Sequence, residues 1–483
     1  MIDKRQFYID GAWVSPAVAR DFPVIDPSTE EEVAVISLGD RADTDAAVAA
    51  ATRAFPGWAA LSMGERIRYL EKLLEAYEAR AEEMAEAMSL EMGAPIDWSR
   101  SQQVPSGTWH IGNAITAAKA FAQVRPLGDH APTDRIVHEP IGVVGMITPW
   151  NWPMNQVSLK VAYAAAVGCT MVLKPSEIAP LSSALFAEMV DAAGWPKGVF
   201  NMVQGDGVGV GTQMSLHPDI DMISFTGSSR AGIAITKAAA DTLKRVSLEL
   251  GGKGANLIFA DADGAAVKRG ARHCFNNTGQ SCNAPTRMLV ERSIYDDAVE
   301  IARETAEKTS VASAHEEGRH IGPLVSEAQW TKVQGLIQAG LDEGARLVAG
   351  GTGRPEGLNR GYYVRPTVFA DVTNDMTIAR EEIFGPVLSI IPFESEAEAV
   401  EIANDTPYGL TNYVQSSDGA RRARLARLLR AGMIEMNGQG RGAGSPFGGV
   451  KQSGNGREGG VWGLDEFCEV KAVSGWPEDL AAE

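Results

Sequence analysis

Cys282 has the surroundings that a catalytic thiol needs. It lies in the stretch 275–287, where its neighbours are small or polar and Gly279 precedes it closely. A substrate can approach such a thiol, and the thiolate can form a covalent intermediate. Burial as a small apolar side chain is the commoner use of an intracellular cysteine, and we expect it for Cys169 and Cys274, which lie in apolar runs.

Two further residues could assist a nucleophile. Glu249 stands between Leu248 and Leu250 at the end of an apolar run. A carboxylate there is either paired structurally or partly desolvated with a raised pKa, and in the second case it is a candidate base near neutral pH. Asn151 is fixed among two tryptophans and two prolines. That rigidity suits a preorganised amide donor, although a turn asparagine is the commoner use.

A helix that begins directly after an apolar strand, at 225–232, could bind a pyrophosphate. Ser228 could cap this helix, and its first amides could hold the anion; a plain strand–turn–helix junction fits the pattern equally. The glycine-rich run 205–211 also follows a strand, but Val210 stands where G-x-G-x-x-G needs a glycine. We interpret that run as a loop leading into a helix.

Lys174 and Glu177 follow another buried strand at its carboxyl end. Ligands bind at such ends in open α/β sheets, and this pair could grip the two hydroxyls of a ribose. A solvated loop with two surface charges is the alternative for the tetrapeptide taken alone.

These residues lie within two series of alternating strands and helices. Strands are predicted at 141–147, 170–173, 199–203, 221–225 and 245–250, and then at 256–259, 288–291, 364–369, 387–392 and 409–414; helices are predicted at 157–167, 182–193 and 231–240, and then at 265–275, 294–308, 327–343 and 396–404. Such alternation indicates mostly parallel sheets covered on both faces. The glycines of 251–254 separate the series and predict two α/β domains with a cleft between them. The stretch 63–92 is predicted to be an amphipathic surface helix with Arg66 on its polar face.

Composition excludes several classes of protein. The 483 residues carry a net charge of −18, which disfavours nucleic acid and anionic membranes. The first ten residues lack the apolar core of a signal peptide, and no apolar stretch is long enough to span a bilayer. Four cysteines are too few for a disulfide scaffold, so we expect a cytoplasmic protein. There is no C-x-x-C or H-E-x-x-H pattern, so we expect no metal site.

Several motifs together resemble the NAD(P)-dependent aldehyde dehydrogenase superfamily. They occur in the family's order between 7–13 and 469–471, essentially the whole chain. They are Pro-Trp-Asn-Trp-Pro at 149–153, Lys-Pro-Ser-Glu at 174–177, Phe-Thr-Gly-Ser at 225–228, Leu-Glu-Leu-Gly-Gly-Lys at 248–253, Gly-Gln-Ser-Cys at 279–282, Glu-Glu-Ile-Phe-Gly-Pro at 381–386 and Pro-Phe-Gly-Gly-Val-Lys-Gln-Ser-Gly at 446–454.

The resemblance implies a catalytic role for five residues. Cys282 matches the nucleophile, and Glu249 matches the base that activates water. Asn151 matches the side chain that forms an oxyanion hole with the Cys282 amide. Lys160 and Glu458 correspond to residues proposed to relay protons in some members. The implied reaction is thiolate attack on an aldehyde, hydride transfer to the nicotinamide, and hydrolysis of the resulting thioester to a carboxylic acid.

The resemblance also implies the cofactor, which we expect to be NAD+, with NADP+ as the alternative. Glu177 would accept a hydrogen bond from the ribose 2′-hydroxyl and repel a 2′-phosphate, whereas Lys174 would partly neutralise that phosphate. The implied cofactor contacts are Thr148, Pro149, Trp150, Lys174, Ser176, Glu177, Gly207, Phe225, Thr226, Gly227, Ser228, Leu250, Glu382 and Phe384.

The implied fold is α/β, with a Rossmann-like cofactor domain, an α/β catalytic domain and a small β oligomerisation element. The cofactor domain would comprise 1–120 and 141–250 with part of 449–466. The catalytic domain would comprise 251–448, and the oligomerisation element 121–140 and 467–483. Family members are homodimers or homotetramers, and we expect the same here.

The family's substrate funnel implies seven further positions: Trp152, Asn155, Gln156, Leu159, Ser281, Asn283 and Arg441. Buried amides and hydroxyls disfavour a wholly apolar ligand, because their hydrogen bonds to water are lost without replacement. Arg441 could grip a carboxylate, or it could point to solvent from the glycine-rich loop 438–445. We therefore expect short aldehydes with a polar or anionic tail to be preferred over long alkanals.

Two alternatives to this function remain open. One is a coenzyme-A-acylating semialdehyde dehydrogenase, although such enzymes generally lack a base equivalent to Glu249. The other is a non-catalytic binding or structural protein that keeps the fold.

Overall fold

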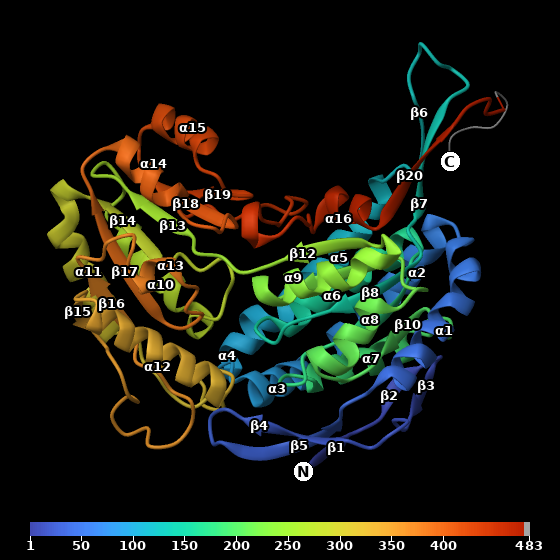
Figure 1. Cartoon of the computed structure of the whole chain (residues 1–483), viewed down its shortest axis with the longest axis horizontal. Coiled ribbons are helices and arrows are strands. Elements are labelled where there is room, and N and C mark those ends of the chain that lie inside the picture. Colours follow the sequence, from blue (N-terminus) through green and yellow to red (C-terminus); the bar gives the residue numbers. More distant parts are fainter. Residues whose placement is uncertain (478–483) are drawn as a thin grey trace.

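Two seven-stranded sheets form the centres of two layered units, as the computed structural model of residues 1–477 shows (Figure 1). The first sheet has the order β12-β11-β8-β9-β10-β2-β3. Its strands are β12 (Arg245–Glu249), β11 (Met222–Thr226), β8 (Val143–Ile147), β9 (Thr170–Lys174), β10 (Phe200–Met202), β2 (Phe7–Ile9) and β3 (Ala12–Val14). Strands β8 to β12 run parallel, and β2 and β3 join antiparallel to their neighbours.

Helices cover both faces of this sheet (Figure 1). They include α1 (Arg41–Ala59), α6 (Pro153–Val167), α7 (Leu181–Ala192), α8 (Thr212–Leu216) and α9 (Ser229–Ala239). Helix α5 (Val104–Ala120) packs against α6. Strand β8 is buried along its whole length, as are β9 and β11. A strand buried on both faces is selected for apolar and β-branched residues, which is why these segments are continuous apolar runs.

The second sheet has the order β15-β16-β17-β14-β13-β18-β19. Its strands are β15 (Arg346–Ala349), β16 (Thr367–Ala370), β17 (Val387–Phe393), β14 (Arg287–Glu291), β13 (Ala255–Ile258), β18 (Thr411–Gln415) and β19 (Met433–Met436). All are parallel to their neighbours except β15. Helices α10 (Ala266–Phe275), α11 (Tyr295–Glu307), α12 (Glu327–Asp342), α14 (Glu396–Asn404) and α15 (Gly419–Leu428) pack around it. The predicted α/β class with parallel sheets is confirmed.

Two smaller sheets lie outside these units. One contains β1 (Ile2–Lys4), β5 (Glu31–Ser37) and β4 (Asp21–Asp26). The other contains β20 (Cys468–Val473), β7 (Arg135–Pro140) and β6 (Val124–Pro126), and its hairpin projects from the body in Figure 1. We call this second sheet the arm.

The stretch 63–92 corrects one prediction. It forms two helices, α2 (Met63–Ala79) and α3 (Ala81–Met92), separated at Arg80. Arg66 is buried, so placing it on an exposed polar face was wrong. Its guanidinium donates to the carbonyls of Leu61 and Ala166, and this pairing makes burial of the cation tolerable.

The carboxyl ends of the parallel strands position the functional segments. Residues 148–153 follow β8, 175–177 follow β9, and 227–228 follow β11. These strands are neighbours in one sheet, so the three segments share one edge. Open α/β sheets bind their ligands at this edge.

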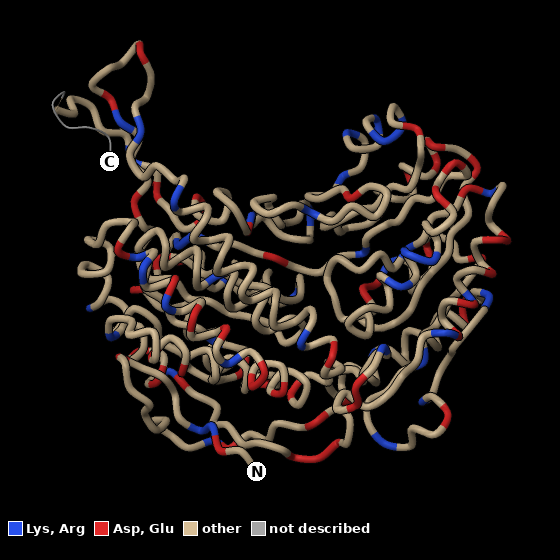
Figure 2. The backbone as a smooth tube through the Cα atoms, turned by 180° about the vertical axis from the view of Figure 1, so that it is seen from behind, with Lys and Arg blue, Asp and Glu red and all other residues tan. Residues whose placement is uncertain are grey.

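Charge does not single out a face of the molecule. Figure 2 shows acidic and basic residues interspersed over both units. Among residues 1–477, no helix combines the length and the apolar character that crossing a bilayer requires.

Candidate active site

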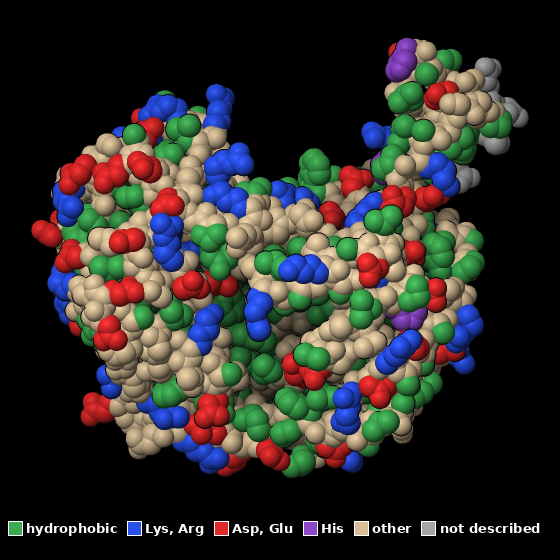
Figure 3. Space-filling model, viewed as in Figure 1, with side chains coloured by type: hydrophobic (Ala, Val, Ile, Leu, Met, Phe, Trp, Pro, Cys, Tyr) green, Lys and Arg blue, Asp and Glu red, His purple; other side chains and the backbone are tan. Residues whose placement is uncertain are grey.

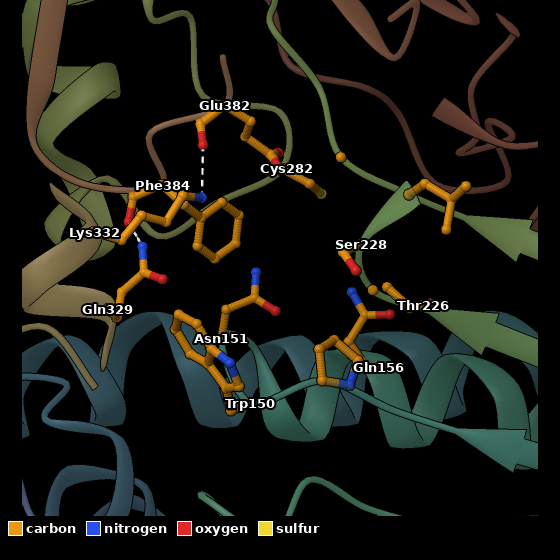
Figure 4. Close-up of a pocket in the computed structure, with 14 residues that line it drawn as sticks. Trp150, Asn151, Gln156, Thr226, Ser228, Cys282, Gln329, Lys332, Glu382 and Phe384 are labelled. Atoms are coloured by element: carbon orange, nitrogen blue, oxygen red, sulfur yellow. Dashed lines mark hydrogen bonds between the residues drawn. The ribbon is translucent and has the colours of Figure 1, made fainter. Parts of the chain in front are cut away.

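A cavity between the two sheets collects most of the predicted cofactor residues. Figure 3 shows a hollow between the units, and Figure 4 shows the side chains that converge on the cavity. Its lining is Pro149, Trp150, Asn151, Gln156, Thr226, Gly227, Ser228, Leu250, Gly251, Cys282, Gln329, Lys332, Glu382 and Phe384. We call it the nucleotide cavity. The predicted residue Phe225 lies buried in β11, directly before this lining.

A second cavity, which we call the funnel, approaches the thiol from another direction. Its lining is Ser101, Gln102, Pro105, Ser106, Trp109, His110, Trp152, Asn155, Gln156, Leu159, Cys282, Asn283, Arg441, Phe447 and Glu458. Cys282 and Gln156 line both cavities. The thiol therefore lies where a ligand in one cavity could react with a ligand in the other.

The loop that carries Cys282 is held in a fixed shape. It follows α10 through a tight turn in which Gly279 has φ of 73°. A side-chain β-carbon at this position would lie 2.1 Å from the Gly385 carbonyl oxygen, so only glycine fits. Beyond the thiol, the buried Tyr413 hydroxyl donates to the Asn283 carbonyl at 2.6 Å.

Asn151 contacts the same loop. Its side-chain Nδ2 donates to the Gln280 carbonyl at 3.0 Å, and its main-chain carbonyl accepts from Asn277 Nδ2 at 2.9 Å. Gln103 also donates to that carbonyl, at 3.2 Å. The amide is thus buried and fixed close to Cys282, as a preorganised donor must be.

Burial sets the protonation of the thiol and of the neighbouring base. It raises the pKa of the Cys282 thiol to about 12, and the nearby Glu382 and Glu249 carboxyls add to this effect. Burial likewise raises the pKa of Glu249 well above its usual value, with a further contribution from Glu458. Both Glu249 carboxyl oxygens lack a hydrogen-bond partner within residues 1–477. An unpaired buried carboxylate binds a proton readily, and this is the property of a base that works near neutral pH.

Lys160 and Glu458 form a buried ion pair, with Nζ and Oε1 2.5 Å apart and side chains only 1% and 8% exposed. Lys160 lies in α6, and Glu458 exchanges backbone hydrogen bonds with Phe447 in the funnel wall. The charges of both members act on Glu249, that of Glu458 raising its pKa and that of Lys160 lowering it. The structure therefore brings together all five residues predicted to be catalytic.

The remaining predicted cofactor residues, Thr148, Lys174, Ser176, Glu177 and Gly207, are not part of the nucleotide-cavity lining. Thr148 follows β8, Lys174, Ser176 and Glu177 lie at the end of β9, and Gly207 follows β10. Lys174 Nζ donates to the Gly205 carbonyl at 2.6 Å and to Glu177 Oε2 at 3.2 Å. The glycine-rich run is less of a loop than expected, because residues 207–211 already form a helical turn that continues into α8.

Sequence reasoning missed two residues of the nucleotide cavity, Gln329 and Lys332. Gln329 Nε2 donates to the Phe384 carbonyl at 2.8 Å, and Lys332 Nζ donates to the Glu382 carbonyl at 2.7 Å. Their three-residue spacing places both on one face of α12, but the sequence does not show that this face turns toward the cavity.

Arg441 lies on the funnel wall. Its guanidinium stacks over the Phe447 ring at 4.6 Å, and its Nε lies 3.5 Å from Glu435 Oε1. The side chain is 28% exposed, so it is neither sealed in nor free in solvent. Ser281 accepts a hydrogen bond from Trp152 Nε1 at 2.9 Å.

Comparison with known proteins places this geometry in a family. The protein-family model described as "Aldehyde dehydrogenase family" matches residues 13–473 of this chain. A Pseudomonas sp. protein named 3-succinoylsemialdehyde-pyridine dehydrogenase is 50% identical over 478 residues, which are 99% of each chain.

Solved structures agree. An aldehyde dehydrogenase from Bartonella henselae is 59% identical with a TM-score of 0.98, over 99% of this chain and 100% of that one. A mutant of aldehyde dehydrogenase C from Pseudomonas syringae, solved with NAD+ and octanal, is 48% identical with a TM-score of 0.96, over 98% and 97% of the two chains. With a family match over almost its whole length, this chain belongs to the aldehyde dehydrogenase family, the oxidoreductases that oxidise aldehydes with NAD(P)+.

Proposed function

We propose that this enzyme oxidises short aldehydes with a polar or anionic tail to carboxylic acids, using NAD+ and a thioester on Cys282. The observation that carries the proposal is the position of that thiol, which lines both the nucleotide cavity and a funnel with amide and guanidinium groups in its wall. The buried Glu249 carboxyl, unpaired within residues 1–477, adds the base that hydrolysis requires.

The nucleotide cavity fits a dinucleotide. Thr226 Oγ1 is buried there without a hydrogen-bond partner in the described part of the chain, so it can still accept or donate. Ser228 caps α9, and the first amides of that helix lie beside the cavity, where they favour an anion. When bound, NAD+ supplies the acceptor for the hydride.

The chain's own residues divide the remaining work. Cys282 attacks the aldehyde carbon, and the Asn151 amide with the Cys282 backbone N–H stabilises the oxyanion that develops. After hydride loss the acyl group remains on sulfur as a thioester. Glu249 then takes a proton from water as the water attacks the thioester. Lys160 and Glu458, whose charges act on Glu249, would then pass that proton onward.

The first prediction concerns the choice of cofactor. We expect kcat/KM with NAD+ to exceed that with NADP+ by at least about tenfold, or ~1.4 kcal/mol. Lys174 interacts with two carboxylates, Glu177 and Asp206, so a 2′-phosphate would meet a net negative charge. Glu177→Gln should reduce the ratio of kcat/KM with NAD+ to kcat/KM with NADP+. Glu71→Gln, which alters only a surface ion pair with Lys119, is the matched control. A clear preference for NADP+ in the unmodified enzyme would refute this argument.

The second prediction concerns the substrate. We expect kcat/KM with NAD+ to be higher for succinic semialdehyde than for hexanal, by about tenfold, with betaine aldehyde and benzaldehyde completing the panel. Asn155 and Arg441 can replace the water bound to a polar tail, whereas an alkyl tail would leave them unpaired. The relative named for a semialdehyde supports this order, and the neighbour solved with octanal supports the reverse one. A wide advantage for hexanal would eliminate the polar-tail proposal.

Product analysis with and without coenzyme A separates hydrolysis from acyl transfer. The Glu249 carboxyl supports hydrolysis, so the free carboxylic acid should form in the absence of coenzyme A. An obligatory requirement for coenzyme A would replace this proposal with the acylating alternative.

We also propose the domain division and the assembly. Residues 1–120 and 141–250 with part of 449–466 would bind the cofactor, and 251–448 would carry the nucleophile. The oligomerisation element, 121–140 and 467–483, which includes the arm, would mediate a homodimer or homotetramer in the cytoplasm. Residues 478–483 of this range lie outside the described residues. Strand β20 is largely exposed, which supports its burial against another subunit.

A further inference from the structure

His110 is a buried titratable residue to which the reaction above assigns no role. It lies in α5, and its Nε2 is 2.8 Å from Oδ1 of Asn155 in α6. Both residues line the funnel. His110 is only 7% exposed, whereas Asn155 is half-buried and open to the funnel.

The hydrogen bond fixes the tautomer of this histidine. An amide oxygen can only accept, so the contact with Asn155 requires the proton on Nε2. Nδ1 is buried and has no partner in residues 1–477, so no neighbouring group holds a proton there. Burial, with a smaller contribution from the nearby Arg441 cation, lowers the pKa of His110 to about 4. The ring is therefore neutral at the pH of any ordinary assay.

The same hydrogen bond fixes the orientation of the Asn155 amide. With Oδ1 turned to His110, the planar group must direct Nδ2 elsewhere, and Oδ1 is the only hydrogen-bonded atom of this side chain within the described residues. The indole N–H of Trp152 is already used by Ser281. Asn155 Nδ2 is thus a donor that can serve a ligand in the funnel.

We propose that His110 is a positioning residue, which holds Asn155 so that its N–H donor, and not its carbonyl oxygen, faces an oxygen in the substrate's tail. This inference rests on the proposed function and names how the funnel would recognise a carboxylate or carbonyl tail. If the amide were free to rotate, it could present a lone pair to that oxygen, and the two acceptors would repel each other. Losing one such hydrogen bond is expected to reduce discrimination by about tenfold.

The test is a specificity ratio, kcat/KM for succinic semialdehyde divided by kcat/KM for hexanal. His110→Phe keeps a ring of similar size but removes the donor, and the ratio should fall about tenfold through a higher KM for the semialdehyde. His110→Gln retains an N–H that can reach Asn155, and it should restore most of the ratio. The proposal would be overturned if His110→Phe left the ratio unchanged, or if His110→Gln lowered the ratio as much as His110→Phe does.

Asn155→Leu provides an independent measurement in case His110→Phe does not fold. It should lower the ratio by the same factor, and adding His110→Phe to it should have no further effect, because the two residues act through one donor. Additive losses would show that His110 acts elsewhere. A higher kcat/KM for hexanal than for succinic semialdehyde in the unmodified enzyme would refute the proposed substrate class. The role of His110 is tested separately, by the change in the ratio between the variants and the unmodified enzyme.

Discussion

Replacing Cys282 with alanine is expected to abolish aldehyde-dependent NADH formation, lowering kcat by at least about 10⁴-fold. This thiol lines both cavities, so its loss removes the covalent intermediate at the point where they meet. Hydride transfer from a free aldehyde hydrate would then lack both the thiohemiacetal and the placement of its oxygen beside Asn151. The measurement is NADH absorbance with succinic semialdehyde under single-turnover and steady-state conditions.

Cys274→Ala is the matched control. Cys274 is likewise a free thiol with a raised pKa, but it is buried in α10 and donates to the Val387 carbonyl, outside both cavities. This variant should keep most of its activity, apart from any loss of folded protein. Undiminished NADH formation by Cys282→Ala would remove the nucleophile assignment and leave the two cavities as binding sites.

Much of the site is predictable from the sequence because its residues end or follow buried strands. Apolar runs such as β9 and β11 can be recognised in the sequence as buried strands. A polar residue at the carboxyl end of such a strand must lie at one edge of a parallel sheet. The sequence pattern alone therefore places Lys174, Thr226 and Glu249 at that edge. The family resemblance then supplies their expected roles.

The parts that sequence reasoning missed depend on tertiary contacts. Strands β1 to β5 are not continuous apolar runs, apart from the three-residue β2, and they are ordered because neighbouring strands pair with them. Gln329 and Lys332 belong to a helix that was predicted correctly, but the orientation of that helix is set by packing. The sequence pattern puts Arg66 on a polar face because it cannot show the carbonyl partners, which come from Leu61 and from Ala166, a hundred residues away.

The funnel is predictable only in part for the same reason. Asn155, Gln156 and Arg441 follow from the family's positions, whereas His110 lies in an apolar helix where a histidine is usually a core residue. Its importance emerges only when α5 packs against α6 and the ring meets Asn155.

Replacing Glu249 with glutamine is expected to separate the two halves of the reaction. A first burst of NADH should remain, because thiolate attack and hydride transfer come before the hydrolysis step in which Glu249 acts. Steady-state turnover should then fall by about 10²- to 10⁴-fold, the usual contribution of a general base. Rapid-mixing absorbance measures the burst and the following steady rate in one experiment. The matched control is Glu188→Gln, because Glu188 belongs to a half-buried surface ion pair outside both cavities.

The pH profile gives the same assignment a second test. Burial raises the pKa of Glu249, so at low pH the folded enzyme carries this group protonated and unable to take a proton from water. As the pH rises through that elevated pKa the base form appears, so kcat should increase on this limb and then level off. Glu249→Gln should lack the limb, because glutamine does not titrate. A steady rate and acid limb that survive the substitution would show that water is activated by another group, and Glu458, joined to Lys160 in the funnel wall, would be the next residue to change.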